Sequence, residues 1–302
     1  MKPTLYIAIS LLAATLLLSS CEKTINVNTP PFARKLSVNC NAMVGQPLYI
    51  GVGTSAAIKD QKFRPDLTVR DAVVKLYVND TLTETLVFDN MFGYHSGIPT
   101  LPGNKYSVTV SAPSYDNAFA VTVAPSVVNI VSVTRTPMAR KNEDGEYQDA
   151  VTLTFDDPAG MGDFYVVSVN APQDSFIYNH DFCVNSPDAS VETNATDLAD
   201  VNTCLDNKSI FIRDALFNGS RKQIKFYANS AYIQPVFNGI DSIYSTIELM
   251  HVTEDYFKYS KSARIAEETN ENPFAEPVNV YSNITNGLGI FSILSIDGRQ
   301  IR

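Results

Sequence analysis

The sequence predicts a mainly β protein with two β-sandwich-like domains, the first immunoglobulin-like, and one helix near the C-terminus. Two observations carry this prediction. Short runs, most clearly residues 105–110 and 150–155, alternate between apolar and polar side chains, which is the pattern of strands with one buried face. Gly, Pro and Asn separate these runs at short, regular intervals, as they do in β-sandwiches.

Residues 1–20 have the features of a lipoprotein signal peptide. Lys2 precedes an apolar run at residues 5–18 that is shorter than the ~20 residues a membrane-spanning helix needs. The run ends in Leu18-Ser19-Ser20, directly before Cys21, and small residues before a cysteine are typical of bacterial lipoprotein cleavage sites. We expect Cys21 to carry a diacylglycerol and an acyl chain such as palmitate, which would hold the protein at a membrane. An uncleaved transmembrane anchor is the alternative.

The mature chain divides into three predicted parts. Residues 21–35 are polar, contain two prolines and are interpreted as a lipidated tether. An immunoglobulin-like β domain follows at 36–125, and a second β domain at 126–302. Inside the second domain, residues 171–207 lose all periodicity and fill with Asn, Asp and Ser. We interpret this stretch as a long surface insertion, and long loops often carry binding functions.

Two cysteines lie in this insertion. A disulfide between Cys183 and Cys204 would close a polar loop, and an oxidising compartment permits it, but free thiols are an equal alternative. Cys40 sits in a strand-like run and is expected to pack as a small buried residue. The cysteines form no CxxC pair, so no metal site is predicted from them.

The predicted helix spans about 253–268. Thr253 can cap its first turn, which contains Glu254 and Asp255. Pro273 prevents a continuation. Such a helix is expected to pack across a sheet.

The best acidic cluster is the turn between two predicted strands. Asp156, Asp157 and Asp163 stand there among three residues that favour turns, Pro158, Gly160 and Gly162. Three carboxylates could bind Ca²⁺, which prefers oxygen ligands, but the EF-hand spacing is absent. An acidic surface loop is the favoured interpretation, and we predict no metal.

No catalytic motif stands out. His95, His180 and His251 are scattered, and no nucleophile elbow, P-loop or dinucleotide fingerprint is present. We therefore predict no catalytic residues, no cofactor and no enzyme activity. An enzyme with Asp156, Asp157 and His180 near the insertion is a minor alternative. The formal net charge of −9 argues against nucleic acid as a partner.

Several segments carry a resemblance to a known family. They are Asp71-Ala72-Val73-Val74, Gly103-Asn104-Lys105-Tyr106, Asp214-Ala215-Leu216-Phe217-Asn218-Gly219, and the C-terminal run from Asn272-Pro273-Phe274 through Gly287-Leu288-Gly289-Ile290-Phe291. They resemble a Bacteroidetes-type family of outer-membrane lipoproteins that is known only as a domain of unknown function. Its genes often lie beside those of TonB-dependent receptors. The resemblance implies an outer-membrane location and a role in uptake, but no chemistry.

The C-terminal run also has an interpretation of its own. Residues 278–281 and 290–293, separated by Asn286-Gly287, look like a closing hairpin. It would either complete the core or offer an edge to a partner.

Two triplets match an Asp-Ser/Thr-aliphatic pattern that resembles the O-glycosylation signal of this bacterial group. They make Thr81, in Asp80-Thr81-Leu82, and Ser242, in Asp241-Ser242-Ile243, candidate modification sites. Such triplets also arise by chance, and a turn that leads into a strand is the favoured explanation.

Together these features give one leading hypothesis. The protein is expected to be a non-enzymatic lipoprotein that acts as an accessory or binding component of a TonB-dependent uptake system. Its partners would be the membrane, through the lipid, and a β-barrel receptor. A structural or adhesive surface module is the alternative. The residues after Cys21, Glu22 and Lys23, match an acidic export signal poorly, so the face of the outer membrane stays open.

Overall fold

The computed structural model describes residues 32–57, 66–170, 184–192, 209–237, 239–270, 276 and 278–302. Residues Arg34–Arg302 form one compact unit, and the fold below is that of this unit. The predicted signal peptide, most of the tether, and Cys21, His180, Cys183 and Cys204 lie outside the described residues. The prediction of a disulfide is therefore neither supported nor contradicted.

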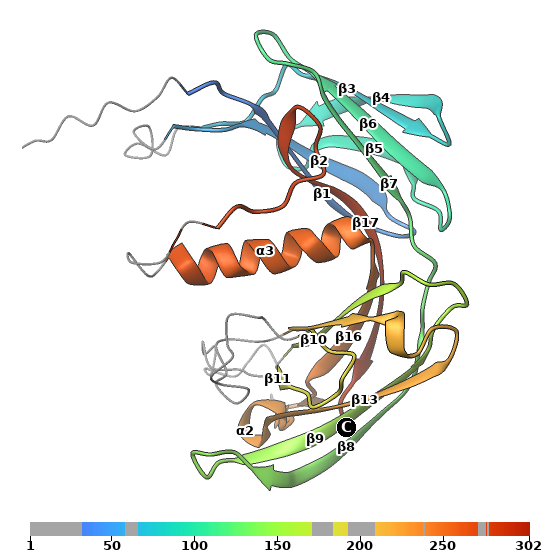
Figure 1. The fold of residues 1–302 in the computed structure, drawn as a ribbon, viewed down its shortest axis with the longest axis vertical. Coiled ribbons are helices and arrows are strands. Elements are labelled where there is room, and N and C mark those ends of the chain that lie inside the picture. The colour runs from blue at the N-terminus through green and yellow to red at the C-terminus, as the bar shows by residue number, and fades with distance from the viewer. Residues whose placement is uncertain are drawn as a thin grey trace, which may run out of the picture. The chain divides into compact units, whose positions relative to one another are not determined.

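Eleven strands form the largest sheet. Its N-terminal strands are β1 (Leu36–Met43), β2 (Pro47–Thr54), β3 (Val73–Val78), β4 (Thr81–Asp89), β5 (Gly93–Pro99), β6 (Lys105–Ser111) and β7 (Ala118–Val123). Its C-terminal strands are β10 (Phe164–Asn170), β12 (Ser209–Arg213), β16 (Thr246–Val252) and β17 (Gly287–Gln300). The strand order is β12-β10-β16-β17-β1-β2-β5-β4-β3-β6-β7 (Figure 1).

Smaller elements complete the unit. A second sheet contains β8 (Ile130–Lys141), β9 (Tyr147–Asp156), β11 (Val184–Asn185) and β13 (Arg221–Asn229), in the order β11-β13-β9-β8. Two short strands, β14 (Val236–Phe237) and β15 (Ser242–Ile243), pair with each other. The described helical segments are η2 (Asp214–Leu216), α2 (Ser230–Ile233) and α3 (Glu254–Asn270). The predicted mainly β fold with a helix near the C-terminus is confirmed.

β17 is the element that joins the two predicted domains. Its first part, from Gly287 to Leu294, runs parallel to β1, and its second part, from Ser295 to Gln300, runs antiparallel to β16. The hairpin expected at residues 278–281 and 290–293 is therefore wrong. The second segment belongs to one long strand, and the first is not a strand. A run of six consecutive buried residues in the middle of β17 explains the difference, since a strand covered on both faces loses its alternation.

Two local features fix β17 in place. Gly289 has a φ of +107°, and a Cβ at this position would lie 2.2 Å from the carbonyl oxygen of Val38, so only glycine allows this approach to β1. The Asn283 side chain bonds the backbone of β17 at Phe291, as a neighbouring strand would. Its Nδ2 donates to the carbonyl of Phe291 at 2.9 Å, and its Oδ1 accepts from the Phe291 N–H at 2.9 Å.

Three clusters of buried side chains form the core. The first lies within the β1–β7 region and also contains Ile284, Phe291 and Ile293. The second lies between the β8–β9–β13 sheet and strands β10, β12 and β16. The third surrounds Phe257 of α3. The boundary between 36–125 and 126–302 remains a prediction, but the C-terminal segment packs into the first core.

Helix α3 begins as the sequence predicts. The Tyr256 N–H donates to Oγ1 of Thr253 at 3.2 Å, which caps the first turn. Phe257 is fully buried and anchors the first turns of the helix on the sheet, and Figure 1 shows one end of α3 at β17. None of the helices in the described ranges is both long and apolar enough to cross a membrane.

Candidate functional site

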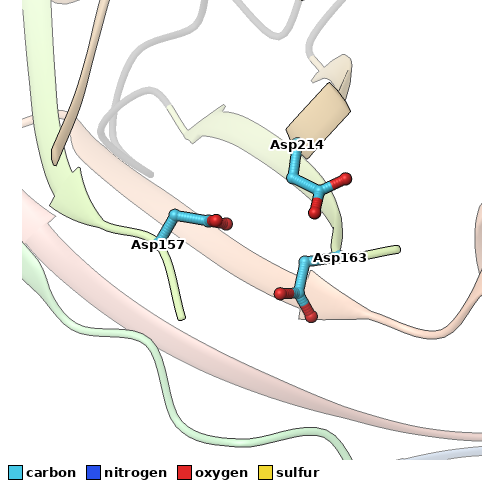
Figure 2. A group of neighbouring side chains, drawn as sticks. All are labelled: Asp157, Asp163 and Asp214. Atoms are coloured by element: carbon cyan, nitrogen blue, oxygen red, sulfur yellow. The ribbon is translucent and has the colours of Figure 1, made fainter. Parts of the chain in front are cut away.

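Three aspartates converge where β9, β10 and β12 meet their loops. Asp157, Asp163 and Asp214 each place a carboxylate oxygen within 4.8 Å of the others (Figure 2). Asp157 and Asp214 are buried and Asp163 is partly exposed. We call these residues the carboxylate cluster.

The strand pairing explains why the three residues meet. Asp157 directly follows β9 and Asp163 directly precedes β10. Asp214 directly follows β12, which pairs with β10 so that Phe164 faces Arg213. The residues next to this pair, Asp163 and Asp214, are therefore neighbours, and the Asp214 N–H donates to the Asp163 carbonyl at 3.2 Å.

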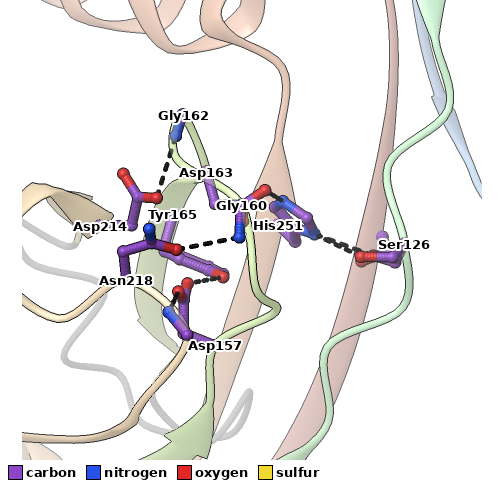
Figure 3. A network of polar contacts seen from close by, with 11 residues as sticks. Ser126, Asp157, Gly160, Gly162, Asp163, Tyr165, Asp214, Asn218 and His251 are labelled. Carbon is purple, nitrogen blue, oxygen red and sulfur yellow. Dashed lines mark hydrogen bonds and ion pairs between the residues drawn. The ribbon is translucent and has the colours of Figure 1, made fainter.

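Asp157 is the most enclosed member of the cluster. Its Oδ1 accepts from the Tyr165 hydroxyl at 2.5 Å, and its Oδ2 accepts from the Gly219 N–H at 2.8 Å (Figure 3). Burial raises the pKa of Asp157 above its usual value, and the negative charges of Asp163 and Asp214 add to this shift. The two hydrogen bonds lower the pKa but do not cancel the shift.

Asp163 is paired with a buried histidine. Oδ1 of Asp163 lies 2.8 Å from Nε2 of His251, whose Nδ1 lies 2.9 Å from the carbonyl oxygen of Ser126. The Ser126 hydroxyl lies 3.5 Å from the same Nδ1, so the tautomer of His251 decides which ring nitrogen donates. The pair connects the cluster to the segment between β7 and β8 (Figure 3).

Asp214, the third member of the carboxylate cluster, belongs to the segment 214–219. Residues 214–219 carry part of the family resemblance, and three of them contact the loop 157–163. Oδ2 of Asp214 accepts from the Gly162 N–H at 3.0 Å, and Oδ1 of Asn218 accepts from the Gly160 N–H at 3.0 Å. The Gly219 N–H bonds Asp157. Gly160 and Gly162 have φ values of +135° and +107°, which lets their N–H groups point at these acceptors.

The cluster has two chemical options. Ca²⁺ takes six to eight oxygens, and three carboxylates could supply several of them. Each of these carboxylates already has at least one hydrogen-bond partner among Tyr165, Gly219, His251 and Gly162. These bonds fasten the loop 157–163 to the segment 214–219, so the contacts describe a structural role. The prediction that the chain holds no metal remains a prediction.

The structure corrects the membership of the predicted acidic cluster. Asp157 and Asp163 are in it, but Asp156 is not. Asp156 lies on the surface, where Arg221 contacts its two carboxylate oxygens at 2.6 and 2.8 Å. Adjacent strand residues point to opposite faces, so Asp156 and Asp157 could not both face the same site. Asp214 could not be added from local sequence, because its position depends on the pairing of β10 with β12.

The candidate glycosylation sites are both exposed. Thr81 starts β4 after the turn Asn79-Asp80, whose φ values of +49° and +66° fit a tight hairpin. Ser242 lies in β15. Their modification stays a prediction.

Cys40 is buried and free, as expected, and burial raises the pKa of its thiol to about 12.

Two hollows on the surface lie away from the carboxylate cluster. The larger, of about 550 Å³, lies between residues 131–133 of β8 and the end of β17 at residues 298–300, with Arg302 beside them. The smaller, of about 280 Å³, lies near Asp66 and Tyr115. The cluster therefore does not line either hollow.

Comparison with known proteins decides the family. The model of a family described as Domain of unknown function (DUF4249) matches residues 22–300. The chain belongs to the DUF4249 family. A search of curated proteins gives no match. Among solved structures, a protein of Corynebacterium diphtheriae that is described as membrane anchored matches at 10% identity and a TM-score of 0.21, over 91% of this chain. The chain spans 62% of that protein, and so weak a likeness carries no argument.

Proposed function

We propose that this DUF4249 protein is a non-enzymatic lipoprotein of the outer membrane that serves a TonB-dependent uptake system as an accessory or binding component. The observation that carries the proposal is the stretch Leu18-Ser19-Ser20-Cys21 at the end of a short apolar run. It supports lipid attachment at Cys21, which holds a folded domain at a membrane without spanning it.

The resemblance to Bacteroidetes-type lipoproteins supports the uptake role. Families encoded beside a TonB-dependent receptor are expected to act with it, as a binding or docking component. The family name itself assigns no activity. The carboxylate cluster fits this interpretation, because hydrogen bonds within the fold account for its described contacts.

The anchor is tested by a Cys21→Ala variant expressed in the native host. Without the thiol there is no site for the diacylglycerol. We expect the wild type to fractionate with the outer membrane and to incorporate labelled palmitate. The variant is expected to incorporate none. Palmitate incorporation by Cys21→Ala would contradict lipidation at Cys21.

The uptake role is tested by deletion. A strain that lacks this protein but keeps the neighbouring β-barrel at its normal level is expected to take up the barrel's ligand more slowly. A wild-type copy is expected to restore the rate. An unchanged uptake rate in the deletion strain would contradict the accessory role. It would not affect the proposal that Cys21 is lipidated.

A structural or adhesive surface module is the second candidate. The apolar outer face of β7, at the end of the large sheet, favours it, because such faces mark interaction sites. Polymers of the purified protein, or a loss of cell adhesion on deletion, would favour this candidate over the uptake role.

A further inference from the structure

Four apolar side chains form an exposed patch on the outer face of β2, β4 and β5. Tyr49, Val87, Met91 and Phe92 are 46, 69, 80 and 52% exposed, and we call these residues the apolar patch. Tyr49 on β2 and Val87 on β4 both pair with His95 of β5, so they flank it on one face of the sheet. The rings of Tyr49 and Phe92 lie 5.4 Å apart. Contiguous exposed apolar groups mark interaction sites, whereas scattered ones do not.

The turn between β4 and β5 is fixed by its backbone, with its apolar side chains in solvent. Oδ1 of Asp89 accepts from the Met91 N–H at 2.7 Å and from the Phe92 N–H at 3.1 Å. Gly93 has a φ of +75°, and a Cβ at this position would lie 2.8 Å from the carbonyl oxygen of Ile50, so only glycine lets the turn lie so close to β2. The exposure of Met91 and Phe92 is therefore a property of a structured turn.

The strand pairing directs this turn toward the end of the sheet at which the chain enters. β1 begins at Leu36, which pairs with Thr54 at the end of β2. β5 runs antiparallel to β2, so its first residue, Gly93, is directed toward that end and its last residue, Pro99, toward the other. The turn between β4 and β5 therefore points toward the start of β1. The turn after β5, which contains Leu101, lies at the opposite end of the sheet.

The chain that leads back to Cys21 is long enough to bring the apolar patch to a membrane. Residues 22–35 connect Cys21 to β1, and an extended chain of that length spans about 45 Å. Tyr49 lies five positions along β2 from Thr54, the partner of Leu36, which is a distance of about 17 Å. The connection is therefore longer than the distance from the start of β1 to the patch.

We propose that the apolar patch contacts the bilayer that holds the lipid of Cys21, an inference that rests on the lipidation proposed above. Met91 and Phe92 enter the region between headgroups and acyl chains, and Tyr49 lies beside them at the headgroups, where aromatic side chains are favoured. Because the lipid keeps the patch near the surface, a contact that is weak by itself is enough. The lipid and the patch together set which side of the β1–β7 region faces the membrane.

Position and chemistry favour a bilayer over a protein as the occupant of the apolar patch. The bilayer is the partner that the anchor itself supplies, and the turn with Met91 and Phe92 points toward the end of the sheet where the chain from the anchor enters. The four side chains offer apolar area and one hydroxyl group, on Tyr49. Interfaces between proteins carry about one hydrogen bond per 100–200 Å² and are enriched in Arg. The patch therefore fits lipid better.

The test uses an introduced Trp, which is a unique fluorescent probe because the chain contains none. Lipidated protein with Met91→Trp or Leu101→Trp is reconstituted on phosphatidylcholine vesicles, with or without bromine on the upper acyl chains, where bromine quenches Trp on contact. We expect the fluorescence of Met91→Trp to fall about two-fold in brominated vesicles, because apolar groups at a membrane surface enter it by about 5–10 Å. Leu101→Trp, at a 55% exposed position, is the matched control and is expected to keep its fluorescence. Equal quenching at the two positions would overturn the inference and leave the patch to a protein partner.

A second probe covers a failure of Met91→Trp to fold. Phe92→Trp keeps an aromatic ring beside Tyr49 and is expected to be quenched in the same way. Adding Met91→Glu to this probe is expected to abolish most of the quenching, because a carboxylate is costly to remove from water. Adding Leu101→Glu instead is expected to change nothing. Quenching that is the same with and without Met91→Glu would contradict insertion of the turn.

Flotation of the vesicles separates this inference from the proposed anchor. We expect all of these variants to float with the vesicles, because the lipid on Cys21 is unchanged. Protein that floats but shows no selective quenching near the turn would contradict the contact of the apolar patch alone. Protein that does not float would contradict the anchor, and the contact with it.

Discussion

The end strands β7 and β8 differ in the features that keep the edge of a sheet from pairing with another strand. β8 has Arg135, Arg140 and Lys141, a proline at 137 and two irregular points in its pairing with β9. β7 has no charge, no proline and no irregularity in its register. Natural proteins protect free edges with the first set of features. The contrast teaches that β8 carries the features that keep a sheet edge unpaired, whereas the sequence of β7 lacks them.

A buried aspartate maintains the irregular course of β8. Asp149, on the neighbouring strand β9, accepts from the Arg135 Nε at 2.6 Å, from the Met138 N–H at 2.9 Å, and from the Ser230 hydroxyl. Met138 has a φ of +49°, and its N–H points at the carboxylate instead of along the β8–β9 ladder. The protection of this edge therefore depends on a residue that belongs to another strand.

Among the changes at the β8 edge, Asp149→Ala is expected to have the largest effect on stability. The change leaves the guanidinium of Arg135, which is 10% exposed, without its partner, and breaking a buried ion pair costs about 3–5 kcal/mol. We expect a loss of that size in the free energy of urea unfolding. We also expect the variant protein to aggregate more readily through the edge of β8. Asp156→Ala removes an exposed pair with Arg221 and is the matched control, with a much smaller expected loss because solvent screens an exposed pair. Similar losses for the two variants would contradict the role of Asp149.

The second effect is on the pH dependence of stability. Burial raises the pKa of Asp149, but the bonds from Ser230, Met138 and Arg135 outweigh it and leave the pKa below its usual value. The carboxylate therefore stabilises the fold fully above its unfolded pKa of about 3.9 and loses this contribution as the pH falls through the lower folded pKa.

Comparison with Asp149→Asn isolates this contribution, because other aspartates also titrate. Urea unfolding between pH 7 and pH 2 is expected to show that the wild type loses more stability than Asp149→Asn at acid pH. Parallel curves for the two proteins would show that Asp149 does not have a lowered pKa.

A smaller effect is expected from Pro137→Thr. The change adds a backbone N–H to the β8 edge and removes one obstacle to pairing. Because Pro137 is exposed, the free energy of unfolding should change by less than about 1 kcal/mol, while self-association measured by light scattering should increase. If Pro137→Thr associates no more than the wild type, proline does not protect this edge.

The sequence predicted the features that depend on neighbours along the chain. The alternation in residues 105–110 and 150–155 marked strands correctly, and Thr253 marked the start of α3. Pro137 in β8 is a local signal of an edge that could have been used. Cys40 was placed in the core correctly because it lies in an alternating strand.

The missed features depend on pairing between distant segments. A strand's own pattern does not reveal whether it lies inside or at the end of a sheet, so β7 could not be recognised as an edge. The position of Asp214 beside Asp163 depends on the pairing of β12 with β10. The parallel register of β17 on β1 depends on residues that are separated by nearly the whole chain.

The measurement that tests the proposed function most directly is a native purification of the tagged, lipidated protein from outer membranes, with quantitative mass spectrometry of what accompanies it. The account predicts a TonB-dependent β-barrel in stoichiometric amount with the tagged protein. Recovery of this chain alone, or of other surface subunits without a barrel, would contradict the uptake role and favour a structural module.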